Sequence, residues 1–137
     1  MATDVPPPSA SLRAQQGPQQ DHKTVDDTLW ALEERFWTQG ADSARHMTTK
    51  DAVFVFPYPS GILQGEALWR DAGVEQRWRS VVMRERHISR KQAIAVLAYR
   101  VSAERQGIPI YEALCTSTYL WDDDAWLRMT HQETPVS

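Results

Sequence analysis

The segment Trp126-Leu127-Arg128-Met129-Thr130-His131-Gln132-Glu133-Thr134-Pro135 has the alternation of a β-strand and carries a histidine among polar neighbours. Alternate residues of a strand face opposite sides of its sheet. Strict alternation predicts that one face holds Leu127, Met129, His131 and Glu133, and that the opposite face holds Trp126, Arg128, Thr130 and Gln132. Both faces are partly apolar, so the pattern does not decide which of them is buried.

Three more long strands precede this segment, at about 80–91, 93–105 and 109–121. The gaps between them have the length of hairpin turns, which indicates an antiparallel meander. Within 109–121, alternation predicts that five residues share one face, and these are Tyr111, Ala113, Cys115, Ser117 and Tyr119. The sequence does not show whether this face lines a pocket or meets a partner.

The first half of the chain has a helical period. Apolar residues recur at offsets of three and four from Val25 to Phe36, which predicts a helix that begins near Thr24 and stops at Gly40. A short helix at about 42–47, a strand at 52–56, a brief hairpin arm at Ile62-Leu63 and a helix at 66–73 are expected next. Helices first and a meander after them predict an α+β fold.

Composition limits the classes of function. The 137 residues predict one domain, 23–137, behind a flexible Pro/Gln-rich tail, 1–22. A net charge of −3 gives no electrostatic reason to expect nucleic acid or a membrane surface as a partner. The single cysteine, Cys115, fits a reducing compartment, and no apolar run is long enough to span a membrane, so we expect a cytoplasmic protein.

The order of elements, with the segments Val53–Pro57, Gly61–Gly65 and Trp126–Pro135, resembles the superfamily of nuclear transport factor 2, ketosteroid isomerase and the SnoaL-like polyketide cyclases. It looks closest to a bacterial branch. The resemblance implies a cone-shaped fold, with a curved and mostly antiparallel sheet wrapped around a long N-terminal helix. It also implies a hydrophobic pocket at the mouth of the cone, and a homodimer. It does not imply one activity, because this fold hosts many.

The isomerases of this superfamily place a carboxylate base directly before a proline on the first strand. By resemblance that position is Phe56, which cannot accept a proton. Their second acidic group falls at Ser117, and their helix tyrosine falls near Glu33. The isomerase set of catalytic groups is therefore absent, which argues against ketosteroid isomerisation.

His131 is the strongest candidate for chemistry, because a histidine exchanges protons near neutral pH. Tyr99 and Tyr111 are candidate hydrogen-bond donors to a substrate oxygen. Aromatic and small polar side chains on the predicted walls would line a pocket for a small apolar or aromatic ligand. The candidate pocket residues are Trp37, Phe54, Phe56, Tyr58, Trp69, Trp78, Cys115, Ser117 and Tyr119. No histidine or cysteine spacing predicts a metal site, and we expect no cofactor.

Two functions remain open. One is a small-molecule pocket protein of the SnoaL-like type, in which His131 and the tyrosines bind a small organic substrate and transfer a proton in an isomerisation, dehydration or cyclisation. The other is a non-catalytic homodimerisation or assembly module of the same fold. An open cavity reached by His131 and Tyr111 would favour the first.

Overall fold

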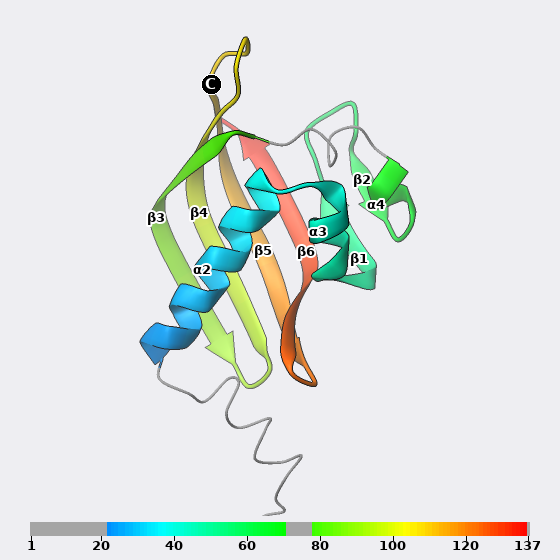
Figure 1. Ribbon diagram of the computed structural model, residues 1–137, viewed down its shortest axis with the longest axis vertical. Coiled ribbons are helices and arrows are strands. Elements are labelled where there is room, and N and C mark those ends of the chain that lie inside the picture. Colours follow the sequence, from blue (N-terminus) through cyan, green and yellow to red (C-terminus); the bar gives the residue numbers. More distant parts are fainter. Residues whose placement is uncertain (1–21, 71–77, 137) are drawn as a thin grey trace, which may run out of the picture.

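A computed structural model describes residues 22–70 and 78–136, in which a long helix comes first and long strands follow, as expected (Figure 1). Residues 1–21 of the predicted tail, and the last part of the helix expected at 66–73, lie outside the described residues. The elements are α2 (His22–Thr38), α3 (Ala41–His46), β1 (Thr48–Val55), β2 (Ile62–Gln64), α4 (Ala67–Arg70), β3 (Ser80–Lys91), β4 (Ile94–Glu104), β5 (Tyr111–Asp122) and β6 (Ala125–Pro135).

The six strands form one curved sheet in the order β2-β1-β6-β5-β4-β3. Strands β3 to β6 are an antiparallel meander, as predicted, and β1 joins its far side by pairing with β6 in parallel. Helix α2 crosses the concave face of this sheet, with α3 beside it over β1 and β6 (Figure 1). The α+β cone fold is therefore confirmed. No helix among the described residues is long and apolar enough to cross a membrane.

Helix α2 buries the stripe that the sequence indicated. Val25, Leu29 and Phe36 are buried against the inner side chains of β4, β5 and β6. The helix ends before Gly40, which adopts an extended conformation and begins α3. Long-range aromatic contacts then fix the helix on the sheet, since Phe36 packs edge-on against Phe54 of β1 with ring centroids 5.6 Å apart.

The predicted faces of β6 are wrong because the strand contains a bulge. Thr118 of β5 pairs with Thr130, but the next residue, Tyr119, pairs with Arg128, so Met129 is an extra residue in β6. The extra residue reverses the alternation. Arg128 and His131, predicted on opposite faces, are consequently both fully buried on the concave side. The predicted grouping within β5 holds, and its Tyr111–Tyr119 face is the concave one.

Candidate functional site

A carboxylate lies at the centre of the core. Glu33, on the sheet-facing side of α2, has no exposed surface. Tyr119 and Arg128 donate hydrogen bonds to its Oε1, over 2.6 Å from the phenol and 3.1 Å from Nη2. Ser117 donates to Oε2 over 2.5 Å, and the hydroxyl of Tyr99 donates to the same oxygen. Four donors match the four lone-pair sites of a carboxylate, so Glu33 is fully satisfied.

Arg128 balances the charge of Glu33 from β6. Its guanidinium carbon lies 4.0 Å from the ring centroid of Phe36, which gives the buried cation an aromatic contact as well as an ionic one. Arg128 also donates a hydrogen bond to the hydroxyl of Tyr119. Its Nε and Nη1 atoms are buried without a hydrogen-bond partner. The guanidinium is therefore held mainly by charge and ring contacts.

His131 connects this buried cluster to a second carboxylate. Its Nδ1 lies 2.8 Å from the oxygen of Ser117, and its Nε2 lies 2.9 Å from Oε2 of Glu133. The single hydroxyl proton of Ser117 is donated to Glu33, so Ser117 accepts its other bond from Nδ1–H. Glu133 accepts from Nε2–H. Both ring nitrogens then carry protons, and His131 is an imidazolium.

The pKa shifts agree with these assignments. Burial alone would lower the pKa of His131, but the hydrogen bond to Glu133 and the charges of Glu133 and of Glu33, whose Oε2 lies 3.6 Å from Nδ1, raise it above its usual value. Burial would raise the pKa of Glu33, but the charge of Arg128, with His131 and Ser117, holds it well below its usual range. Glu33 is therefore charged at neutral pH, and the raised pKa of His131 favours its protonated form, in agreement with the two protons that its hydrogen bonds require.

The buried charges cancel. Glu33 and Glu133 contribute two negative charges, and Arg128 and His131 contribute two positive charges, so the cluster is neutral overall. An isolated charge in such a place would be strongly unfavourable, but paired and hydrogen-bonded charges are tolerated. Because Glu33 has no remaining acceptor site and a lowered pKa, it is suited to holding the cluster together and not to accepting a proton.

Glu133 is the member of the cluster that reaches the surface. Its side chain keeps 10% of its surface exposed, whereas those of Glu33, Arg128 and His131 keep none. The hydroxyl of Tyr111 donates to its Oε1 over 2.9 Å. Within residues 22–70 and 78–136 no other side chain donates to Glu133, which leaves one lone pair on each carboxylate oxygen available. Burial and the charge of Glu133 raise the pKa of Tyr111 far above its usual value, so Tyr111 stays a neutral hydrogen-bond donor.

Glu133 and Tyr111 line a pocket of about 240 Å³ at the end of the sheet where β1 and β6 end and β5 begins, which we call the mouth pocket. The Tyr111 ring stacks on Trp78 with centroids 5.5 Å apart and planes 12° apart. The guanidinium carbon of Arg105 lies 4.7 Å from the centroid of Trp78. Residues 56–60, which follow β1, form the facing wall. The described walls thus offer a carboxylate, a phenol, a cation and aromatic rings to one small ligand.

The predicted site residues fall into two layers. Tyr111, Phe56, Tyr58 and Trp78 line the mouth pocket. His131 does not line it, but contacts its wall residue Glu133. Trp69 is partly buried against Phe54, outside the mouth pocket. The remaining candidates are buried in the core around or beside Glu33, and these are Tyr99, Trp37, Phe54, Cys115, Ser117 and Tyr119. Burial also raises the pKa of Cys115, which makes it a poor nucleophile.

Sequence reasoning missed Glu33, Arg128 and Glu133. A signal for Glu33 was present, because it follows Leu29 by four residues and precedes Phe36 by three, within the apolar stripe of α2. A charged residue in such a stripe indicates a buried partner. No comparable signal existed for Arg128, because strict alternation without the bulge places Arg128 and His131 on different faces of the strand. Within the described residues, no group of three or more potential metal ligands comes together.

No family model matches the sequence, and none of the curated proteins matches it. Solved structures do match its fold. A candidate ketosteroid isomerase from Parabacteroides distasonis superposes with a TM-score of 0.73 at 16% identity, over 87% of this chain and 93% of that one. A candidate calcium/calmodulin-dependent kinase II association domain from Exiguobacterium sibiricum gives 0.68 at 16%, over 87% and 97%.

A candidate dehydratase of the NTF2-like family from Streptomyces avermitilis gives a TM-score of 0.66 at 13% identity, over 84% of this chain and 97% of that one. The same fold thus carries proteins described as enzymes and as an association domain. The chain has the nuclear transport factor 2-like fold, as the sequence predicted. At these identities the likeness concerns the fold alone, and the function has to be argued from the site.

Proposed function

We propose that this nuclear transport factor 2-like domain binds a small organic molecule in the mouth pocket and transfers a proton at Glu133. The observation that carries the proposal is the position of Glu133, which joins a buried imidazolium on one side and borders an aromatic pocket on the other. A carboxylate with free lone pairs at a pocket wall can accept a proton from a bound ligand.

The neighbouring groups have distinct roles in this proposal. In the free protein Tyr111 donates its one hydroxyl proton to Glu133. In this proposal the hydroxyl turns when the ligand binds and donates instead to a ligand oxygen that gains negative charge as the proton leaves, which also frees Oε1 of Glu133. His131 is a positioning residue, because it contacts Glu133 and does not line the pocket. The volume of about 240 Å³ is below the usual range for drug-sized ligands and favours a small substrate, such as a cyclic ketone or hydroxyketone.

Hydrogen–deuterium exchange on a panel of small ketones tests the proposal directly. Cyclic and acyclic ketones in D₂O are incubated with the protein, and loss of the α-proton signal is followed by NMR. We expect catalysed exchange for at least one ketone, and a reduction of about 100-fold or more in Glu133→Gln. Tyr111→Phe keeps the stacked ring and removes the hydroxyl, and we expect a smaller reduction.

Glu112→Gln is the matched control, because Glu112 lies on the opposite face of β5 and pairs with Arg100. This variant should exchange ketone protons at the wild-type rate. Exchange that is unchanged in Glu133→Gln, or absent for every ketone, would rule out the proposed chemistry. If a ketone binds in the mouth pocket but its protons do not exchange, the protein binds ketones without catalysing proton transfer.

A non-catalytic assembly module is the second candidate function. A homodimer is compatible with both this function and proton transfer at Glu133. Val82, Val96 and Leu114 are exposed on the convex face of three neighbouring strands. Exposed apolar residues on a sheet face are typical of an interface. We expect a homodimer at micromolar concentration by light scattering and a monomer for Leu114→Arg. An assembly module would keep its dimer mass in Glu133→Gln and exchange no ketone protons.

A further inference from the structure

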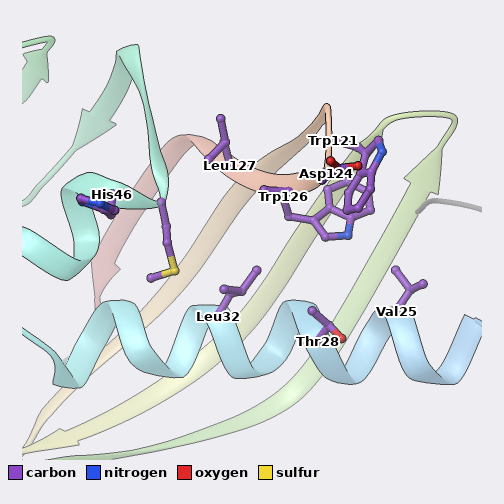
Figure 2. Close-up of a pocket in the computed structure, with 10 residues that line it drawn as sticks. Val25, Thr28, Leu32, His46, Trp121, Asp124, Trp126 and Leu127 are labelled. Carbon is purple, nitrogen blue, oxygen red and sulfur yellow. The ribbon is translucent and has the colours of Figure 1, made fainter. Parts of the chain in front are cut away.

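A second hollow lies away from Glu133, between α2, α3 and the turn that joins β5 to β6 (Figure 2). Its volume is about 410 Å³. None of its lining residues belongs to the mouth pocket. We call it the α2 groove, and it is lined by Val25, Thr28, Leu32, His46, Met47, Trp121, Asp124, Ala125, Trp126 and Leu127.

The α2 groove extends along α2. Val25, Thr28 and Leu32 follow one another along one side of it, on the same face of α2 (Figure 2). The helix rises about 10 Å along its axis from the first of these residues to the last. Figure 2 shows the two tryptophans at the Val25 end and His46 at the other end. An elongated ligand therefore fits it better than a round one.

The tryptophan end has a distinct chemistry. Trp121 and Trp126 pack edge to face, with ring centroids 5.3 Å apart and planes at 65°. The indole of Trp126 is turned towards α2, so that its N–H edge borders the groove (Figure 2). An indole N–H donates and never accepts a hydrogen bond. A ligand atom at this end is therefore best an acceptor oxygen on a flat ring system.

Charge narrows the class further. The carboxylate of Asp124 lies beside the tryptophan pair (Figure 2). No Lys or Arg is among the described residues that line the groove, so a negative group on the ligand would lose water without gaining a cationic partner, whereas an uncharged carbonyl needs none. The rest of the groove is mainly apolar, with Leu32, Met47 and Leu127 on its walls.

We propose that the α2 groove is a second binding site, for an elongated, flat and uncharged molecule that carries a carbonyl oxygen. The rings lie along α2 between Val25 and Leu32, and the carbonyl oxygen accepts a hydrogen bond from Trp126. This site is independent of proton transfer at Glu133, because the two pockets share no residue.

Prodan tests the proposal, because it is a neutral naphthalene with a ketone and its fluorescence shifts to the blue in apolar surroundings. We expect saturable binding to the full chain with a dissociation constant on the order of 10–100 µM. Naphthoate, an anion of similar ring size, should compete at least 10-fold more weakly than uncharged methyl naphthoate. Equal competition by the two would contradict the role of charge.

Two threonines on α2 provide a matched pair of variants. Thr28 and Thr38 each donate a hydrogen bond to the backbone oxygen four residues before them, over 3.0 Å. Only Thr28 lines the groove. Thr28→Phe fills the groove from the exposed side of the helix and should weaken prodan binding at least 10-fold. Thr38→Phe should leave it unchanged.

Trp126→Phe should weaken prodan binding several-fold through loss of the N–H donor. Trp78→Phe changes the mouth pocket and not the α2 groove, so we expect it to leave the affinity for prodan unchanged. Binding that is lost in Trp78→Phe, that is unaffected by Thr28→Phe, or that appears only at millimolar prodan would overturn the proposal. Circular dichroism spectra of each variant establish that a lost signal does not come from unfolding.

Discussion

Glu33 shows how a residue that looks unsuitable for a core can organise one. Its carboxylate accepts hydrogen bonds from four side chains on three strands of the sheet. Those four side chains are Tyr99 of β4, Ser117 and Tyr119 of β5, and Arg128 of β6. A buried carboxylate of this kind fixes the position of the helix on the sheet, because every donor must be within reach at once.

Replacing the carboxylate tests this role. Glu33→Gln leaves the cluster with one excess positive charge, because Arg128 loses its carboxylate partner while His131 keeps Glu133. It also introduces an amide that cannot accept from all four donors. We expect the free energy of unfolding to fall by about 3–5 kcal/mol, measured by urea denaturation. Glu34→Gln, the exposed neighbour on the same helix, should change it by less than about 0.5 kcal/mol. Similar losses in both variants would contradict a specific role for Glu33.

The imidazolium of His131 makes stability depend on pH. Its folded-state pKa is raised, so the folded state binds more protons than the unfolded state between the unfolded value, about 6.5, and the raised value. The stabilisation is complete below that window and is lost as the pH rises through the folded pKa. We expect the free energy of unfolding to decrease across this window, and the decrease to be weaker in His131→Gln.

Nitrogen NMR of the imidazole checks the assignment directly. At pH 7 both ring nitrogens of His131 should have the chemical shifts of protonated nitrogens. A neutral ring at this pH, with one unprotonated nitrogen, would contradict the imidazolium and the charge balance that depends on it.

Strand β6 positions two parts of the site through one irregularity. The bulge at Met129 places Arg128 next to Glu33, and still places His131 next to Ser117. In a regular strand these residues would face opposite sides, and one of them would point to solvent. Bulges frequently occur where a side chain has to be redirected towards a site.

Deletion of Met129 restores strict alternation and should be severely destabilising. Either Arg128 or His131 would turn to the convex face, and Glu33 would lose one of its cationic neighbours. We expect a loss of about 3 kcal/mol or more in the free energy of unfolding, or a chain that does not fold. Met129→Leu keeps the extra residue and should be close to wild type. A well-folded deletion variant would show that the bulge is dispensable.

The sequence predicted these elements well and the buried cluster poorly, for physical reasons. Apolar periodicity and turn residues are local signals, so α2 and the four meander strands were found to within a few residues. A bulge is also local, but it leaves no mark in the alternation of β6, where both faces are partly apolar. The cluster itself depends on contacts such as Glu33 to Arg128, which are 95 residues apart in the chain.

For the whole molecule, the core begins with α2. Val25 is the first buried residue of the described chain, and every buried residue after it packs on the sheet or on the helices above it. We therefore expect the predicted domain to fold without the segment before it. A chain that starts at residue 23 should melt within about 3 °C of the full chain, by calorimetry. A much lower melting temperature would show that residues 1–22 contribute to the fold.

The mouth pocket was predicted only in outline. Aromatic residues on the closing elements indicated a pocket, and the resemblance to a cone fold placed it at the open end. Packing among separate segments of the chain, 56–60 and those around residues 78, 105, 111 and 133, decides which of these side chains reach the surface. No local sequence pattern records such packing. His131, the strongest candidate from sequence, is fully enclosed, and Glu133 two residues later borders the pocket instead.

The central position of β6 has a consequence for synthesis of the protein. β6 lies between β1 and β5, so the two parts of the sheet cannot join until residues 125–135 have left the ribosome. Until then, the nascent chain exposes apolar surface around Phe54 together with the unpaired edges of β1 and β5. Such edges are prone to wrong pairing. We therefore expect these edges to need more protection during synthesis than those of a fold built from consecutive hairpins.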